Sequence, residues 1–133
     1  MAIHLVRLGS ARKAGEGLRL GTVRHLPRGV RKSDYAKRDY FDAWLPELAP
    51  SAALVHAAMS KPPMDEARWR RFARSYRAEM NKPDKKRLLE AFARLSEGAD
   101  FAVGCYCEDY SRCHRSLLAE LFREHGAKVV VEG

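Results

Sequence analysis

Short apolar stretches predict two strands near the start of the chain. Positions 3–8 are mostly aliphatic, and positions 18–23 alternate apolar with polar or small side chains. Both patterns are typical of strands. A polar connection at 10–17 separates them, and a basic loop at 24–33 follows, in which a proline and a glycine oppose regular structure.

Apolar residues at helical spacing predict helices in the middle of the chain. Asp65 is placed to cap a helix that runs to about Met80, with apolar side chains on one face and arginines over much of the rest. A second amphipathic helix, with apolar residues up to Leu95, follows and ends near Gly98. A shorter helix, capped by Ser51 and stopped by the Lys-Pro-Pro at 61–63, precedes both.

The remaining segments predict one irregular stretch and a strand–helix–strand unit. Aromatic residues and two prolines at 35–50 favour an irregular, packed segment, with Trp44 as a core anchor. A strand at 101–107, a helix at 116–125 and a strand at 128–131 complete the chain. A right-handed crossover would make these two strands parallel neighbours.

The order of elements predicts an α/β fold with a small, mostly parallel sheet of about four strands flanked by helices. With 133 residues, of which 46% are hydrophobic, we expect one domain over 1–133. No stretch approaches the roughly 20 apolar residues that span a bilayer, and the start lacks the features of a signal peptide. We therefore expect a cytoplasmic protein without a membrane partner.

Positive charge is concentrated in the first third of the chain. The net charge is +8, and residues 1–40 hold ten Lys or Arg against three Asp or Glu. This balance favours nucleic acid or phosphorylated small molecules as partners, and a solubilising surface is the alternative. The candidate nucleic-acid contacts are the arginine-rich helix and Arg24, Arg28, Arg31 and Lys32.

Reactive side chains gather in one loop before the last predicted helix. Cys105, Cys107 and Cys113 are the only cysteines, and His114 and Arg115 follow directly. Open α/β sheets bind ligands at this position, beyond the carboxyl end of a strand. An odd, clustered set of cysteines does not fit a secreted disulfide framework, so we expect reduced thiols.

One interpretation of this loop is a metal site. Cys105, Cys107, Cys113 and His114 supply the kinds of ligand that tetrahedral zinc takes. Cys105 and Cys107 would point to the same face of a strand. Against a metal, adjacent side chains in a helix diverge by about 100°, which would separate Cys113 from His114. The spacing also matches no common zinc motif.

A second interpretation is a reactive thiol in an anion site. Cys113 would lie at a helix N-terminus, where free N–H groups and the helix dipole favour a thiolate. His114 would act as general base or acid toward the Cys113 thiol. Cys105 would be a second thiol, with disulfide cycling between Cys105 and Cys113 as a variant. Arg112 and Arg115 would hold an anion. A third interpretation is purely structural, with the cysteines as ordinary buried residues.

Several stretches resemble the signature of the domain-of-unknown-function 488 (DUF488) family. The resemblance runs in order over most of the chain, and parts of it are similar to the YeaO-like branch of that family. The stretches are 27–29, 44, 48–51, 72–80, 103–109 and 112–116. The resemblance implies an α/β fold in a small bacterial cytoplasmic protein, and it implies no established activity.

The family pattern is a cysteine at a strand end and a Cys-His-Arg about eight residues later. Cys105 and the residues at 113–115 match it. Many members carry Glu where this chain has Cys107, so a site with three thiols would be particular to this chain.

Our leading hypothesis is a Cys/His/Arg site that binds an anionic, phosphate-bearing ligand and acts as a thiol-dependent enzyme or as a binding protein. A zinc-binding module and a nucleic-acid-binding protein are the alternatives. The catalytic candidates are Cys113, His114 and Cys105, and the candidate anion contacts are Arg115, Arg28, Arg24 and Arg112.

Overall fold

The computed structural model describes residues 1–59 and 64–132, so the predicted helix stop at 61–63 lies outside the described residues. A parallel five-stranded sheet in the order β3-β2-β4-β1-β5 forms its centre. The strands are β1 (Ile3–Arg7), β2 (Leu18–Gly21), β3 (Ala43–Trp44), β4 (Phe101–Cys105) and β5 (Val129–Val131). The helices are α1 (Ala52–Met59), α2 (Glu66–Met80), α3 (Pro83–Leu95) and α4 (His114–Glu124). Three short 3-10 turns complete the elements: η1 (Lys32–Asp34), η2 (Pro46–Leu48) and η3 (Tyr110–Arg112).

The α/β class and the parallel sheet are confirmed, with one strand more than expected. The extra strand is β3, two residues long at the edge of the sheet, where the sequence predicted irregular structure. The prediction that β4 and β5 are neighbours is wrong, because β1 lies between them and pairs with both. Ile3, Leu5 and Val6 of β1 are almost fully buried, and a strand that is apolar on both faces is most stable in the middle of a sheet.

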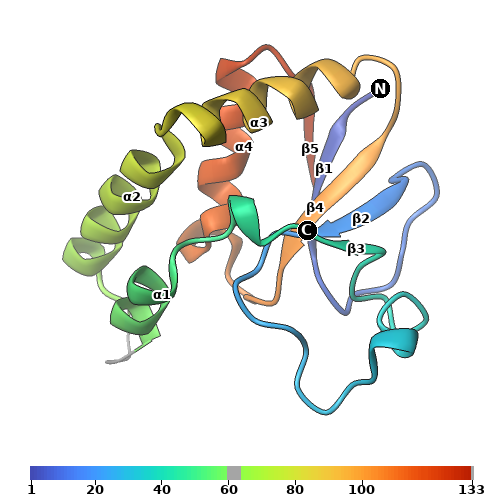
Figure 1. Ribbon diagram of the computed structural model, residues 1–133, viewed down its shortest axis with the longest axis horizontal. Coiled ribbons are helices and arrows are strands. Elements are labelled where there is room, and N and C mark those ends of the chain that lie inside the picture. The colour runs from blue at the N-terminus through green and yellow to red at the C-terminus, as the bar shows by residue number, and fades with distance from the viewer. Residues whose placement is uncertain (60–63, 133) are drawn as a thin grey trace.

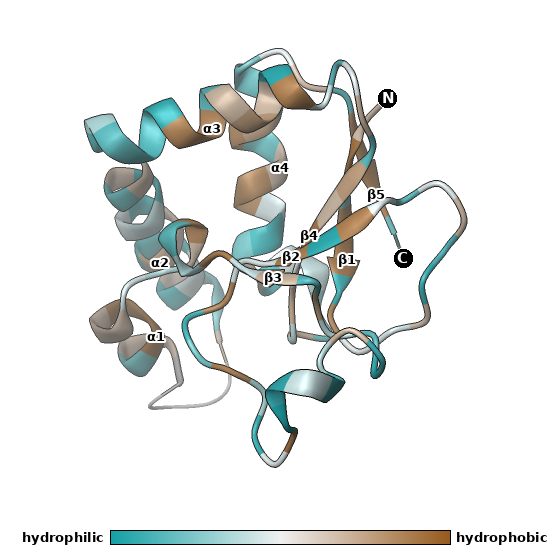
Figure 2. Cartoon of the chain, turned by 45° about the vertical axis from the view of Figure 1, so that its right-hand side comes forward, coloured by the Kyte–Doolittle hydropathy of each residue, from teal (hydrophilic) through white to brown (hydrophobic). Residues whose placement is uncertain are grey.

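The two faces of the sheet are covered differently. Side chains alternate between faces along a strand, so Ile3 and Val103 pack into the core formed with α2, α3 and α4. Val6 and Ala102 belong to a second core cluster, completed by residues of the loop at 22–42. Figures 1 and 2 show the helices on one side of the sheet and the long loops on the other. The sheet therefore has one helical layer and one layer of loops.

The helix starts follow the capping signals of the sequence. The Asp65 side chain accepts a hydrogen bond from the Arg68 amide at 2.8 Å, and Ser51 Oγ accepts one from the Leu54 amide at 3.2 Å. Pro83 occupies the first turn of α3, where its missing N–H costs nothing. Within the described ranges, no helix is long and apolar enough to cross a membrane.

Two glycines allow close packing at the sheet. Gly21 and Gly104 are paired across β2 and β4. A Cβ at Gly21 would lie 2.4 Å from the Phe41 ring, and one at Gly104 would lie 2.6 Å from the Val6 carbonyl oxygen. Gly21 of β2 is therefore the contact surface for Phe41.

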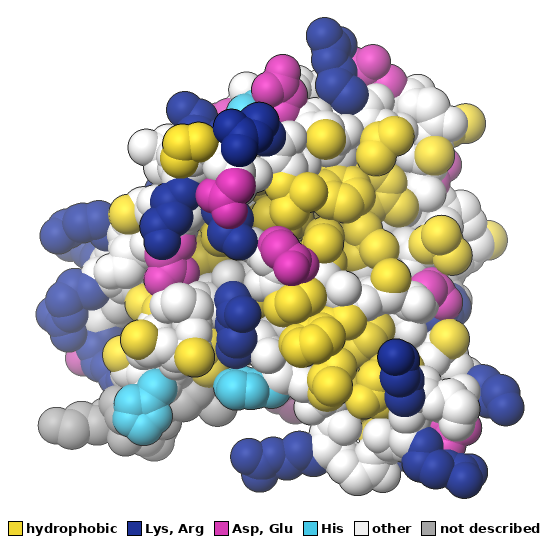
Figure 3. Space-filling view, viewed as in Figure 1, with side chains coloured by type: hydrophobic (Ala, Val, Ile, Leu, Met, Phe, Trp, Pro, Cys, Tyr) yellow, Lys and Arg dark blue, Asp and Glu magenta, His cyan; other side chains and the backbone are white. Residues whose placement is uncertain are grey.

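Trp44 is not the core anchor that the sequence predicted. Its side chain lies on the edge strand β3 and is 44% exposed, while its indole N–H donates to the Val23 carbonyl at 2.8 Å. Phe41, Leu48, Ala49 and Pro50 are the buried residues of this segment. Figure 3 shows the face between α3 and β3, where apolar side chains gather and Lys and Arg lie mostly around the margin.

A buried ion pair holds the loop layer against the sheet. The Arg19 side chain is fully buried on the loop face of β2, and its Nε donates to Glu16 Oε1 at 2.6 Å. The two Nη atoms donate to the carbonyl oxygens of Ser10, Ala11 and Asp39. One guanidinium therefore joins the loop at 8–17 to the loop at 22–42.

We predict that Arg19→Met lowers the free energy of unfolding by about 3–5 kcal/mol, because it leaves a buried carboxylate without its partner. Urea unfolding followed by circular dichroism measures the change. The control is Arg94→Gln, which breaks the exposed Arg94–Glu97 pair and is expected to cost under about 0.5 kcal/mol. Equal effects of the two substitutions would contradict the role given to Arg19.

Candidate functional site

The cysteine loop lies beyond the carboxyl end of β4, as the sequence predicted. β4 ends at Cys105, and α4 begins at His114 with Cys113 as its N-cap. Cys113 has φ −122° and ψ 147°, an extended conformation. The predicted divergence of Cys113 and His114 is therefore wrong, because Cys113 precedes the helix. Its sulfur lies 3.9 Å from His114 Nδ1.

The three thiols and the imidazole form one cluster. The sulfur of Cys105 lies 3.6 Å from that of Cys107, although β4 ends before Cys107 and the predicted strand to 107 is too long. The donor atoms of Cys105, Cys113 and His114 all lie within 4.8 Å of one another. All three cysteines are reduced; Cys105 and Cys113 are buried and Cys107 is exposed.

Hydrogen bonding favours a thiolate at Cys113. Its pKa is lowered well below the ordinary value, first because the thiols of Cys105 and Cys107 hydrogen-bond to its sulfur. The backbone N–H and the positive charge of Arg115 lower the pKa further, against the effect of burial. The pKa of Cys105 is raised, because its proton is held by Cys107 and Cys113 and because it is buried. The cluster thus stabilises one negative charge, on Cys113.

His114 is a neutral imidazole with a defined tautomer. A carbonyl oxygen only accepts hydrogen bonds, so the 2.6 Å contact between Nε2 and the Thr22 carbonyl places the proton on Nε2. The lone pair is then on Nδ1, the atom nearest to Cys113. Burial lowers the pKa of His114 to about 4. His114 can therefore accept a proton or bind a metal ion through Nδ1.

Arg115 supplies a buried positive charge beside the thiols. Its side chain is 2% exposed, and Nη2 donates to the Cys107 carbonyl at 2.7 Å. The guanidinium lies over the Tyr110 ring, 5.7 Å from the ring centre. Its Nε is buried and has no hydrogen-bond partner in the described part of the chain. The site thus holds a cation with one donor still to be satisfied.

The other three arginines predicted to contact an anion differ from Arg115 and from one another in the groups that they contact. Arg24 donates to three carbonyl oxygens of the segment at 46–50, and Arg112 pairs with Glu66 at 2.7 Å. Arg28 lines a pocket of about 290 Å³ formed by the basic loop and the loop after β4. Anion binding by these three arginines stays a prediction.

The arginine-rich face of α2 is partly neutralised. Arg70 pairs with Glu66, and Arg77 bridges Glu120 and Glu124 of α4. A nucleic-acid partner stays a prediction.

Sequence reasoning missed Thr22. Its carbonyl oxygen sets the tautomer of His114, and its hydroxyl donates to the Gly104 carbonyl at 2.8 Å. Both contacts join residues more than 80 positions apart. No local pattern in the sequence predicts that a backbone carbonyl sets the tautomer of a distant histidine.

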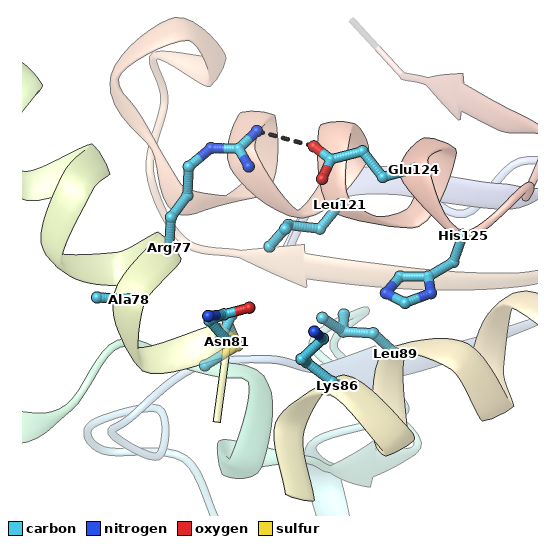
Figure 4. Close-up of a pocket in the computed structure, with 9 residues that line it drawn as sticks. Arg77, Ala78, Asn81, Lys86, Leu89, Leu121, Glu124 and His125 are labelled. Atoms are coloured by element: carbon cyan, nitrogen blue, oxygen red, sulfur yellow. Dashed lines mark hydrogen bonds and ion pairs between the residues drawn. The ribbon is translucent and has the colours of Figure 1, made fainter. Parts of the chain in front are cut away.

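A larger pocket, of about 510 Å³, lies away from the cysteines. Figure 4 shows that it is formed where the C-terminal ends of α2 and α4 meet α3, with Arg77 and Glu124 joined by an ion pair on one side. Cys113 precedes the opposite end of α4, about 16 Å along the helix axis from its last residue. This pocket is therefore separate from the thiol cluster.

A comparison with protein-family models identifies the family. The model that matches is DUF488-N3a, described as the active DUF488-N3 subclade, and it covers residues 3–126. The chain belongs to the DUF488 family, which confirms the predicted relationship; membership of the YeaO-like branch stays a prediction. Neither a curated protein nor a solved structure matches the chain.

The buried imidazole predicts a pH dependence of stability. The pKa of His114 is about 4 in the folded protein and about 6.5 when unfolded, so only the unfolded state gains this proton as the pH falls between these values. The free energy of unfolding is expected to fall by about 3 kcal/mol between pH 7 and pH 4 through this group.

Urea unfolding at the two pH values, with a chelator present, tests this prediction. The matched variant is His114→Gln, whose amide can still donate to Thr22 but does not titrate. It should lose less stability on acidification than the wild type. Identical losses would show that other groups cause the pH dependence.

Proposed function

We propose that this DUF488 protein is a thiol-dependent enzyme that acts on a small anionic substrate, with Cys113 as the nucleophile. The observation that carries the proposal is the position of Cys113 at the N-cap of α4, hydrogen-bonded by two further thiols. These surroundings favour the thiolate, which is the reactive form of cysteine. The description of the matching subclade as active supports an enzymatic role.

The neighbours of Cys113 suit distinct roles. His114 is uncharged at neutral pH, so its Nδ1 can take the proton of Cys113 whenever the thiol is protonated and return it to the leaving group. Arg115 places a positive charge at the sulfur and favours an anionic substrate. Cys105 retains its proton and shares it between the sulfur of Cys107, at 3.6 Å, and the sulfur of Cys113.

Access to the nucleophile favours entry from the side of Cys107. The Cys113 side chain is only 2% exposed, whereas Cys107 is the exposed member of the cluster. A substrate would therefore pass Cys107 and the loop at 106–112 before it meets the thiolate.

Cysteine reactivity tests the proposal. At pH 6, iodoacetamide is expected to label Cys113 at least about tenfold faster than Cys105 or Cys107, because only Cys113 is substantially a thiolate there. Peptide mass spectrometry gives the site and rate of labelling. Cys113→Ser should abolish the fast phase, and Cys107→Ser, which keeps a hydroxyl donor, should retain it. Slow labelling of all three thiols at similar rates would exclude the assigned nucleophile.

A second candidate function is zinc binding, favoured by the spacing of the donor atoms. Zinc bonds of about 2.0–2.3 Å to nitrogen and sulfur put neighbouring ligands of a tetrahedron about 3.5–3.8 Å apart. The Cys105–Cys107 sulfur distance of 3.6 Å and the Cys113–His114 distance of 3.9 Å are close to this range. The bond from His114 Nε2 to Thr22 also resembles the hydrogen bonds that orient zinc-binding histidines.

Metal content distinguishes this candidate from a free thiol. If the cluster binds zinc, native mass spectrometry of protein purified without chelator should show one zinc ion per chain, and added zinc should raise the melting temperature of chelator-treated protein. Cys105→Ser should remove both effects. Ser111→Ala, in the same loop but outside the cluster, should leave them unchanged. Metal-free protein without zinc stabilisation would rule the module out.

A further inference from the structure

We propose that the pocket beside the cysteine loop binds an aromatic phosphate, of the class to which nucleoside monophosphates belong, and holds it for the thiol site. The proposal names a substrate class for the proposed enzyme and therefore rests on that function. The pocket has a volume of about 290 Å³ and is lined by His25, Leu26, Pro27, Arg28, Tyr40 and Tyr106.

The walls of the pocket suit a planar apolar group. The rings of Tyr40 and Tyr106 meet edge to face, with centres 6.1 Å apart, and both are only partly buried. Leu26 and Pro27 add apolar surface, and the Leu26 side chain is 42% exposed. Such surfaces bind aromatic rings by stacking, with little dependence on the identity of the ring.

The pocket is held in shape before a ligand binds. The Tyr106 hydroxyl donates to the His25 carbonyl at 3.0 Å, which joins the loop after β4 to the basic loop. On the other side, the guanidinium of Arg38 lies 6.0 Å from the centre of the Tyr40 ring. A preformed wall reduces the entropy that binding costs.

The charge at the rim is positive and uncompensated. Among the residues that the structure describes, Arg28 has no hydrogen bond or ion pair, unlike its neighbours Arg24 and Arg31. The nearest acidic residue along the Tyr106 loop, Glu108, pairs with Arg7. An anionic group on the ligand can therefore pair with Arg28 without displacing another partner.

The pocket and the thiols share a loop and a core cluster. Tyr106 stands between Cys105 and Cys107 in the chain, and its ring packs on the same apolar cluster that contains Cys105 and Cys113. Both features lie beyond the carboxyl ends of the strands, where ligands of open α/β sheets bind. A ring seated on Tyr106 would lie beside the loop that carries Cys107, the exposed thiol.

Calorimetric titration of the whole chain with adenosine monophosphate tests the binding site. Adenosine and inorganic phosphate, each half of the ligand, are expected to bind at least about tenfold more weakly, because each loses one of the two contacts. Arg28→Gln should weaken binding of the nucleotide by about tenfold and leave adenosine unaffected. The matched control is Arg31→Gln, on the same loop but already paired with Asp34, which should change neither affinity.

The same variants separate this inference from the proposed function. Cys113→Ser should bind the nucleotide as tightly as the wild type, since the pocket does not use the thiol. Nucleotide at a concentration equal to the wild-type Kd should slow alkylation of Cys107 about twofold in the wild type and by only about a tenth in Arg28→Gln, because tenfold weaker binding leaves most of the variant unoccupied. Absence of nucleotide binding, an equal affinity for adenosine, or binding without protection of Cys107 would each overturn the pocket assignment. The rate of Cys113 alkylation without ligand is independent of these outcomes. That rate tests the proposed function, and it does not test the pocket.

Discussion

Arg19 is the residue on which the loop layer of this protein depends. A sheet needs cover on both faces, and here only one face has helices. Loops carry backbone carbonyls that need hydrogen-bond donors when water is excluded. A single buried guanidinium supplies those donors to both loops, and Glu16 balances its charge. The loop at 22–42 is thereby held against β2, and this loop carries Thr22, Arg28 and Tyr40 to the edge where the thiols lie.

The bond between Thr22 and His114 connects this loop layer to the helical layer. It joins the end of β2 to the first residue of α4. Because the Thr22 carbonyl accepts a hydrogen bond from the Nε2–H group, Nδ1 is left as an acceptor toward Cys113. A backbone carbonyl thus sets the chemistry of the site without touching any sulfur. Gly21 also contributes, since the absence of a side chain there lets Phe41 of the loop pack against β2.

Features with a local cause were predictable from the sequence. The helix caps at Ser51 and Asp65 and the apolar runs of β1 and β4 depend on neighbouring residues, and they were placed correctly except that β4 ends at Cys105 and not at 107. The two-residue strand β3 was missed because its pairing with β2 comes from the tertiary fold. The place of β1 between β4 and β5 likewise depends on competition among strands for the centre of the sheet.

In the candidate site, too, features with a local cause were predictable and features set by the tertiary fold were not. Its residues and its position after β4 followed from the sequence, because the strand, loop and helix are contiguous. The meeting of Cys113 with His114 did not follow, since it depends on the extended backbone of a single capping residue. The role of Thr22 depends on a contact across the sheet end, for which the sequence holds no periodic signal.

Charge balance shows which side chain distinguishes the two candidate functions. A thiolate is both the nucleophile of an enzyme and a ligand of zinc, so the low pKa of Cys113 serves either. With no metal ion, one thiolate at Cys113 balances the positive charge of Arg115. With zinc, two thiolates would neutralise the ion and leave Arg115 uncompensated, whereas three would restore the balance. A zinc site balanced in this way uses Cys107 as a thiolate, while the nucleophile does not need it.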